Sequence, residues 1–188
     1  MIVLLVYGLS LLLFVLLLLW ILIPALYGLP PVSTRPERIQ KALRLANLQR
    51  DELLYDLGAG DGRVLMIAAR DFGAKAVGIE VGPIQCALIG LRIAANGLAN
   101  QIQIRWENFY KADLGGADVV FVYATSNEVK KLASHLETQM KRGARLVSIS
   151  ADFPEWEPST FDDRDLIFIY EMPPTKGNIG SYLMRKQA

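Results

Sequence analysis

The pattern of apolar and polar positions divides the chain into two parts. Residues 1–34 contain no charged side chain, and residues 1–23 are almost wholly leucine, isoleucine, valine and phenylalanine. Further along, short apolar runs alternate with amphipathic stretches. Strands that alternate with helices are typical of a parallel sheet with right-handed crossovers. The pattern therefore predicts an apolar N-terminal helix followed by one α/β domain.

Seven apolar runs predict the strands of this domain. The first five alternate with helices and are expected to be parallel, whereas the last two are expected to form a C-terminal antiparallel hairpin. Capping boxes at Thr34-x-x-Glu37 and Thr125-x-x-Glu128 predict the starts of two helices. The predicted strands occupy residues 53–56, 76–79, 102–106, 117–123, 145–150, 166–170 and 181–185, and the predicted crossover helices occupy residues 63–72, 82–96 and 125–142.

The N-terminal apolar run has the length of a membrane span. About 20 apolar residues in a helix span the hydrocarbon core of a bilayer, and aromatic residues such as Trp20 and Tyr27 favour its interface. The alternative is a cleavable signal peptide, which needs a positively charged start, a shorter apolar run and a small-residue cleavage site. The uncharged start and the long run favour a retained transmembrane helix over residues 1–27, followed by a linker over residues 28–36.

The charges that follow this run predict an orientation. Arg35, Arg38 and Lys41 come soon after the apolar residues, and nothing positive precedes them. The positive-inside rule then predicts a single-pass membrane protein with the bilayer as a partner. Its C-terminal domain, residues 37–188, is expected on the cytoplasmic side.

Composition narrows the range of other partners. The 188 residues carry a net charge of +1, which gives no strong electrostatic case for a nucleic-acid partner. The lone Cys86 excludes an intramolecular disulfide and is compatible with a reducing compartment. The sequence shows no cluster of cysteine and histidine that supports a metal site. We therefore expect neither nucleic acid nor metal.

A glycine-rich turn between the first strand and the first crossover helix is the strongest chemical signal. Residues 55–63 read Tyr-Asp-Leu-Gly-Ala-Gly-Asp-Gly-Arg, which exposes bare backbone near the positive end of a helix dipole, as in nucleotide-cofactor sites. The dinucleotide fingerprint G-x-G-x-x-G is not met, because Arg63 stands at the third glycine position. Asp56 would repel a pyrophosphate and attract an ammonium group.

The cofactor that fits this turn is S-adenosylmethionine (SAM), which carries an ammonium and a sulfonium group and no phosphate. The alternative is an ordinary turn whose glycines serve only the backbone. Ligands of parallel sheets bind outside the carboxyl ends of the strands, so one cofactor along that edge could touch several strand ends. The residues expected at this edge are the glycine loop, Glu80, Asn108, Phe109, Thr125, Asp152 and Phe153.

Together these landmarks resemble the class I SAM-dependent methyltransferases over about residues 33–186. The resemblance implies a Rossmann-like, doubly wound, mostly parallel sheet of seven strands. In that family the first loop holds the methionine end of SAM, an acidic residue ending the second strand takes the ribose hydroxyls, and a residue pair after the third strand meets the adenine. These roles map to Asp56, Gly58, Gly60 and Gly62, to Glu80, and to Asn108 and Phe109, while Asp61 either contacts the cofactor through water or caps the helix.

A narrower resemblance concerns the substrate. Residues 56–63 are similar to the Asp-Leu-Gly-Ser-Gly-Asp-Gly-Arg loop of a small group of membrane-associated lysine methyltransferases, which modify the ATP synthase c subunit or the adenine nucleotide translocase. Residues 153–156, Phe-Pro-Glu-Trp, resemble the Phe-Pro-x-Trp-like stretch of that group. The chain departs from the group at Val81-Gly82 and at Asp152, where the group has Leu-Asn and Arg. The resemblance implies methyl transfer to a lysine of a membrane-associated protein.

The residues expected to meet the substrate come after the fourth and fifth strands. Phe153 and Trp156 are expected to bind it, and Trp156 or Tyr123 could guide a lysine ammonium by cation–π contact. Asp152 and Glu171 are possible acceptors of the lysine proton. The candidates for a catalytic role are Asp152, Trp156 and Tyr123. Two other functions stay open, namely methylation of a lipid or hydrophobic small molecule, and a SAM-binding membrane module without transferase activity.

Overall fold

The computed structural model describes residues 2–26, 34–123 and 125–187, with side chains described throughout except at residues 2, 19–26 and 127. Most of the predicted linker, residues 28–33, therefore lies outside the described residues, as do the predicted interfacial Tyr27, the side chain of Trp20, and Ala124.

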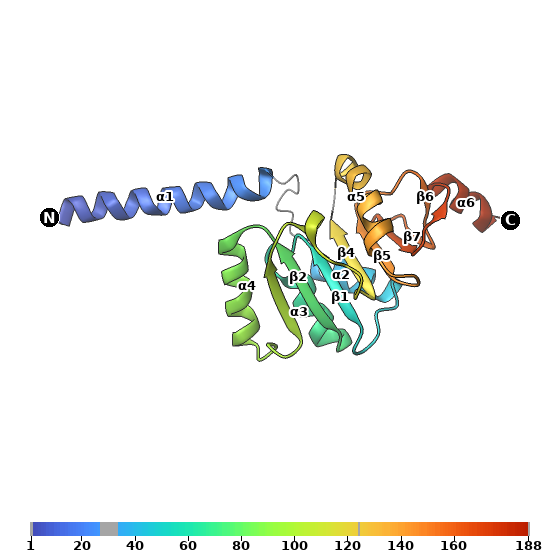
Figure 1. Ribbon diagram of the computed structural model, residues 1–188, viewed down its shortest axis with the longest axis horizontal. Coiled ribbons are helices and arrows are strands. Elements are labelled where there is room, and N and C mark those ends of the chain that lie inside the picture. Colours follow the sequence, from blue (N-terminus) through green and yellow to red (C-terminus); the bar gives the residue numbers. More distant parts are fainter. Residues whose placement is uncertain (1, 27–33, 124, 188) are drawn as a thin grey trace.

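A seven-stranded sheet forms the centre of the domain (Figure 1). Five parallel strands are followed by two antiparallel ones, in the spatial order β3-β2-β1-β4-β5-β8-β7. This order confirms the predicted Rossmann-like, mostly parallel sheet. Its strands are β1 (Leu53–Leu57), β2 (Lys75–Glu80), β3 (Ile102–Trp106), β4 (Val119–Tyr123), β5 (Arg145–Ile149), β7 (Thr160–Asp162) and β8 (Ile167–Glu171); β6 (Trp156–Glu157) and β9 (Thr175–Lys176) pair separately.

Helices cover both faces of the sheet. On one face pack α2 (Pro36–Leu45), α3 (Arg63–Phe72) and α4 (Pro83–Ala95), and on the other pack α5 (Ser126–Gln139) and the short turn η1 (Phe109–Lys111). Successive strand residues point to opposite faces, so Val119 and Val120 belong to different cores. Because both faces are buried, the central strands are continuous apolar runs, which is why the sequence pattern located them.

The C-terminal hairpin differs from the prediction in one strand. Its two strands are β7 and β8, whereas residues 181–185, predicted to be a strand, lie in helix α6 (Ile179–Gln187). The side-chain oxygen of Asn178 accepts a hydrogen bond from the backbone N–H of Ser181 at 3.1 Å. An asparagine in this position satisfies a free amide at a helix start. This cap favours a helix more strongly than the weak alternation of apolar and polar residues at 181–185 favours a strand.

Neither predicted capping box forms. Helix α2 is preceded by Arg35 rather than Thr34 and starts with a proline, which needs no cap for its missing N–H. Thr125 does precede α5, but its side chain makes no capping hydrogen bond. The carboxylate of Glu128 instead accepts a hydrogen bond from the Tyr110 hydroxyl at 2.7 Å.

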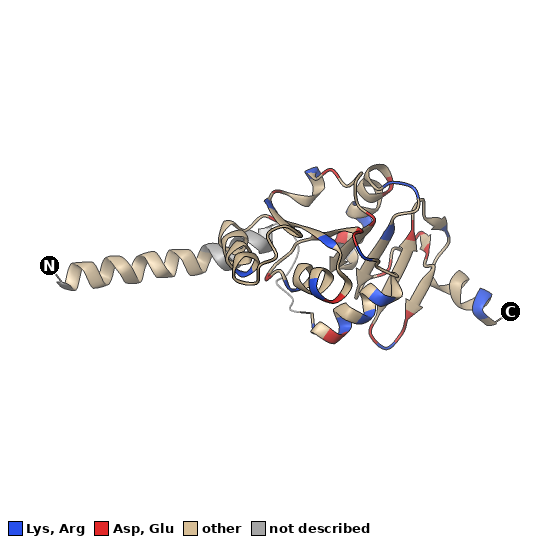
Figure 2. Cartoon of the chain, turned by 90° about the horizontal axis from the view of Figure 1, so that it is seen from below, with Lys and Arg blue, Asp and Glu red and all other residues tan. Residues whose placement is uncertain are grey.

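The N-terminal residues form helix α1 (Ile2–Leu26), which carries no charged residue (Figure 2). Among the residues that the structure describes, no helix is long and apolar enough to cross a membrane. This finding contradicts the predicted single-pass localisation with its cytoplasmic domain, and it leaves the predicted transmembrane helix and bilayer partner without support.

Candidate active site

The glycine loop follows the carboxyl end of β1, as predicted. Gly58, Gly60 and Gly62 have φ values of 89°, 57° and 77°, in the left-handed region that other residues rarely adopt. The N–H groups of Gly58 and Ala59 donate to the carbonyl oxygen of Ile79 at 2.9 and 3.0 Å. These bonds fold the loop over the end of β2, and α3 then begins at Arg63. The loop therefore presents backbone at the start of a helix.

Glu80, the last residue of β2, is tied to this loop by its carboxylate. One carboxylate oxygen accepts the N–H of Gly60 at 2.9 Å, and the other accepts the N–H groups of Val81 and Gly82 at 2.9 and 2.8 Å. Glu80 is 6% exposed. Three backbone donors therefore hold the carboxylate at the edge where a ribose was predicted to bind.

Asp56 lies in β1, on the same face of the sheet as Glu80, and is 4% exposed. Burial raises the pKa of its carboxyl group from 3.8 to about 8, and the negative charges of Glu80 and Asp61 contribute in the same direction. A cation placed here would lower the pKa of Asp56 again, since a positive charge favours the ionised carboxylate. The site therefore fits the ammonium group of SAM.

Asp61 and Arg63 form an ion pair beside the loop. The Nε and Nη2 atoms of Arg63 donate to Asp61 Oδ2 at 2.9 and 2.5 Å. Burial opposes the charge of Asp61, but the hydrogen bonds from Arg63 outweigh it and hold the pKa of Asp61 below its usual value. Arg63 Nη1 also donates to the carbonyl oxygen of Thr34 at 2.8 Å. Asp61 Oδ1 also accepts the backbone N–H of Arg63, the first residue of α3, at 3.1 Å, and a contact of Asp61 with the cofactor stays a prediction.

The residue pair predicted to meet adenine follows β3 at the same edge. The side-chain oxygen of Asn108 accepts the N–H of Tyr110 at 3.0 Å and starts the turn η1. Phe109 is 3% exposed, and its ring centroid lies 4.4 Å from that of Tyr110. The predicted cofactor residues thus come from three strand ends at one edge of the sheet.

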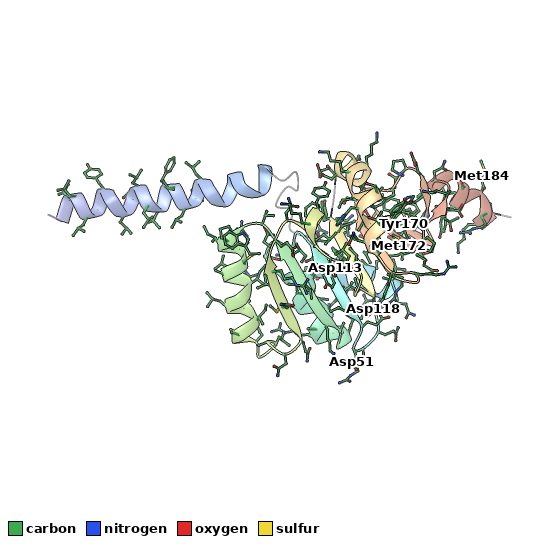
Figure 3. The ribbon with its side chains drawn as sticks, viewed as in Figure 1. Asp51, Asp113, Asp118, Tyr170, Met172 and Met184 are labelled. Atoms are coloured by element: carbon green, nitrogen blue, oxygen red, sulfur yellow. The ribbon has the colours of Figure 1, made fainter. Side chains whose placement is uncertain are left out.

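The predicted substrate-binding residues Phe153 and Trp156 lie in the hydrophobic core on the face of the sheet that α5 covers. The rings of Phe153 and Trp156 stack at 4.4 Å with an interplanar angle of 8°, and both meet the ring of Tyr170 edge-on. Tyr170 belongs to β8, in the C-terminal part of the domain (Figure 3). Phe153 and Trp156 are 1% and 2% exposed. In this arrangement their rings pack against each other, and contact with a substrate stays a prediction.

The catalytic candidates occupy different surroundings. Tyr123, at the end of β4, is half-buried; its hydroxyl accepts a hydrogen bond from Ser150 Oγ at 3.2 Å, and the guanidinium of Arg38 lies 5.9 Å from its ring centroid. Asp152 is half-buried after β5. Glu171 pairs in register with Arg145, the first residue of β5, so it lies at the amino edge of the sheet, away from the glycine loop. This placement argues against Glu171 as the proton acceptor.

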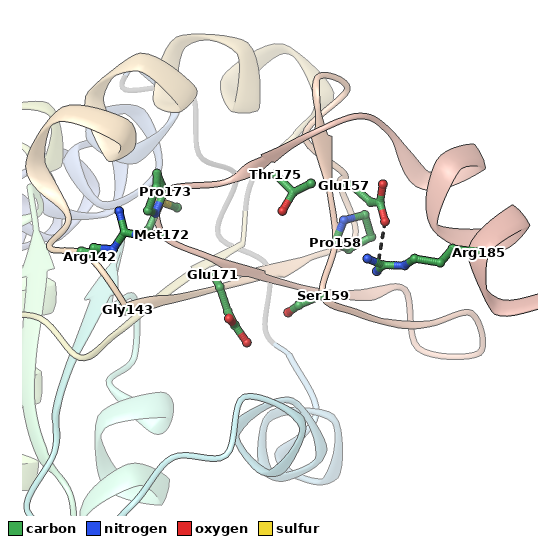
Figure 4. Close-up of a pocket in the computed structure, with 10 residues that line it drawn as sticks. All are labelled: Arg142, Gly143, Glu157, Pro158, Ser159, Glu171, Met172, Pro173, Thr175 and Arg185. Atoms are coloured by element: carbon green, nitrogen blue, oxygen red, sulfur yellow. Dashed lines mark ion pairs between the residues drawn. The ribbon is translucent and has the colours of Figure 1, made fainter.

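A cavity of about 490 Å³ opens at this amino edge (Figure 4). It is separate from the cofactor edge, since Gly143 and Met172, which line it, join the start of β5 to the end of β8. Its polar lining includes Arg142, Ser159, Glu171, Thr175 and the ion pair of Glu157 with Arg185.

Sequence reasoning missed the contact between Tyr110 and Glu128. Tyr110 follows the predicted adenine pair, and Glu128 belongs to a predicted capping box. Their contact joins residues 18 positions apart, which no local pattern indicates. His135 packs edge-on against the Tyr110 ring at 6.3 Å. No group of three or more potential metal ligands occurs in the part of the chain that the structure describes.

Comparison with known proteins identifies the family. Residues 56–160, more than half of the chain, match the family described as the ANTKMT methyltransferase domain. A protein-lysine N-methyltransferase of Saccharolobus islandicus (strain REY15A) is 34% identical over 130 residues, which are 69% of this chain and 81% of that protein. The Mus musculus lysine N-methyltransferase named for the ATP synthase c subunit is 26% identical over 154 residues, which are 81% of this chain and 62% of the mouse protein. The chain thus spans less than two thirds of the mouse protein.

A solved structure supports the cofactor. The crystal structure of an RNA methyltransferase from Salinibacter ruber in complex with S-adenosyl-L-homocysteine has a TM-score of 0.74 and 31% identity, and the match covers 78% of this chain and 97% of that one. S-adenosylhomocysteine is the form of SAM that has lost its methyl group. With the glycine loop, the buried Asp56 and the strand-end Glu80 at one edge of the sheet, the chain belongs to the ANTKMT methyltransferase domain family and is a SAM-dependent methyltransferase.

Proposed function

We propose that the enzyme transfers the methyl group of SAM to a lysine side chain of a protein. The observation that carries this proposal is the likeness to protein-lysine methyltransferases, at 34% identity over 69% of the chain for the Saccharolobus protein. The names of that protein and of the mouse relative both give lysine as the acceptor. A net charge of +1 adds no strong attraction for RNA, the substrate class for which the Salinibacter enzyme is named.

The proposed roles of the cofactor residues follow from their chemistry. Asp56 binds the ammonium group of SAM, and the bare backbone of Gly58, Gly60 and Gly62 lets the methionine part approach closely. Glu80 accepts hydrogen bonds from the ribose hydroxyls, and these replace part of its present hydrogen bonding to the loop. Asn108 and Phe109 border the adenine. When bound, SAM supplies an activated methyl group on its sulfonium, so the protein has to orient an amine in line with it and exclude water.

Labelling with methyl-tritiated SAM tests the proposal. The purified enzyme is incubated with a cell extract, and protein, RNA and lipid fractions are then separated. Label in a protein band supports the proposal, whereas label confined to RNA or to the lipid fraction contradicts it. Asp56→Ala is the matched control, because it should remove the label from every fraction while the fold is kept. Unchanged SAM affinity in that variant would sink the role given to Asp56.

A further inference from the structure

Buried carboxylates are few in the described part of the chain, and they gather at the cofactor edge of the sheet. Asp56, Glu80 and Glu128 are 4%, 6% and 7% exposed. A buried carboxylate is costly unless it is paired or hydrogen-bonded, so each one calls for a partner. The cofactor accounts for Asp56 and Glu80. The proposed cofactor contacts do not include Glu128.

Glu128 lies at the same edge of the sheet as the glycine loop. It lies in the first turn of α5, which begins three residues after β4 ends. Strand β4 is the direct neighbour of β1, which leads into the glycine loop. Because β1 and β4 are parallel, the loop and the start of α5 both follow carboxyl ends at the same edge of the sheet.

The contacts of Glu128 hold it in place without neutralising it. Its Oε2 atom accepts a hydrogen bond from the Tyr110 hydroxyl at 2.7 Å, and Tyr110 directly follows the proposed adenine pair. Its Oε1 atom lies 3.9 Å from Nζ of Lys131, a side chain that is 71% exposed. A distant and exposed partner compensates a buried charge only weakly.

Among the described residues, the other groups that contact Glu128 or Tyr110 are not close positive charges. Burial and the hydrogen bond to Glu128 raise the pKa of Tyr110, so its hydroxyl keeps its proton and donates it in the hydrogen bond. The imidazole of His135 packs edge-on against Tyr110, and its buried Nε2 atom has no hydrogen-bond partner among the described residues. The arrangement thus orients Glu128 through Oε2 and leaves Oε1 with only the distant, exposed Lys131 as a positive partner among the described residues.

We infer that Glu128 receives the ammonium group of the target lysine, an inference that rests on the proposed function. The lysine ammonium transfers one proton to the Glu128 carboxylate, which leaves a neutral amine. The amine nitrogen then forms a bond to the methyl carbon while the sulfur–methyl bond breaks, and sulfur keeps the electron pair of that bond. Tyr110 is a positioning residue, since it acts by fixing one oxygen of Glu128.

The test compares Glu128→Gln with the wild-type enzyme. Glutamine keeps the shape and can still accept the Tyr110 hydroxyl, but it cannot take a proton from lysine. Three quantities are measured, namely the affinity for S-adenosylhomocysteine by calorimetry, the melting temperature, and the initial rate of methyllysine formation in total protein extract at pH 7.5 and pH 10. We expect wild-type cofactor affinity and melting temperature, with a rate about 100-fold lower at pH 7.5.

The pH dependence separates an acid–base role from a structural one. A free lysine has a pKa of about 10.4, so a substantial fraction of lysine is already neutral at pH 10. The deficit of Glu128→Gln should therefore shrink about tenfold or more at that pH. Glu137→Gln is the matched control on the same helix, because Glu137 pairs with Lys176 on the surface; it should keep the wild-type rate.

The outcomes distinguish this inference from the proposed function. A wild-type enzyme that forms no methyllysine refutes the proposed function, and the role of Glu128 with it. A wild-type enzyme that forms methyllysine beside an equally active Glu128→Gln refutes the role of Glu128 alone, as does a deficit that is the same at both pH values or that follows a loss of cofactor affinity. If Glu128→Gln does not fold, Tyr110→Phe decides, since it should lower the rate severalfold at unchanged cofactor affinity; an unchanged rate refutes the inference.

Discussion

Replacing Asp56 with asparagine is expected to change how the stability of the cofactor-free protein depends on pH. Burial, together with the charges of Glu80 and Asp61, raises the pKa of Asp56 from 3.8 to about 8 in the folded protein. Unfolding returns the pKa to the lower value. Between the two values the folded protein keeps a proton that the unfolded chain has lost, so each rise in pH favours unfolding. The stabilising contribution is complete below pH 3.8 and is lost as the pH rises through about 8.

The size of this effect follows from the pKa difference. The free energy of unfolding falls by about 1.4 kcal/mol for each pH unit in the window, and less near its upper end, where the folded protein also loses the proton. From pH 6 to pH 8 the wild-type protein should lose about 2 kcal/mol relative to Asp56→Asn, because asparagine does not titrate. Urea denaturation at several pH values measures this difference without cofactor.

The control is the same substitution at an exposed carboxyl group. Asp71 lies at the end of α3, and its Oδ2 atom accepts a hydrogen bond from Gln40, which an asparagine oxygen can also accept. Asp71→Asn should follow the wild-type pH profile. If the wild-type and Asp56→Asn profiles run parallel from pH 6 to pH 8, the carboxyl of Asp56 is not protonated in the folded protein and the reasoning fails.

Three further predictions concern the loop and the core. Binding of S-adenosylhomocysteine at pH 7 should release about one proton from the wild-type protein and none from Asp56→Asn, because the ligand ammonium ionises Asp56; calorimetry in two buffers of different ionisation enthalpy measures this, and equal release from both proteins would contradict it. Gly62→Ala, at a φ of 77° with the added Cβ 3.1 Å from Ile89, should lower the free energy of unfolding by about 1–2 kcal/mol in urea denaturation. Trp156→Ala should lower it by about 3–5 kcal/mol, since it opens a cavity beside Phe153 and Tyr170; a loss below about 1 kcal/mol would show that the ring is not core packing.

Sequence reasoning located the sheet and the glycine loop because their signals are local. The central strands are buried on both faces and appear as continuous apolar runs. The loop has a glycine at each backbone position that requires a positive φ, so Gly58, Gly60 and Gly62 were recognisable from spacing alone. Glu80 was found because it ends a strand, which brings it to the edge that the loop occupies.

The features that the sequence did not predict depend on contacts between distant residues. Glu128 was interpreted as part of a capping box, whereas its carboxylate bonds the hydroxyl of Tyr110, 18 positions away. Phe153 and Trp156 were placed where a substrate should enter, but they stack on each other and pack edge-on against Tyr170, which buries both rings. The final helix was missed because Asn178, a single capping residue, outweighs the alternating pattern that follows it.

The most direct test of the central claim is the chemical identity of the methylated residue. Protein labelled by the enzyme with methyl-tritiated SAM is hydrolysed in acid, and its amino acids are separated by chromatography against methylated standards. The account predicts that the radioactivity elutes with mono-, di- or trimethyllysine and that Asp56→Ala produces none. Radioactivity that elutes with another methylated amino acid, or that is found only in RNA, would contradict the assignment of lysine as the acceptor.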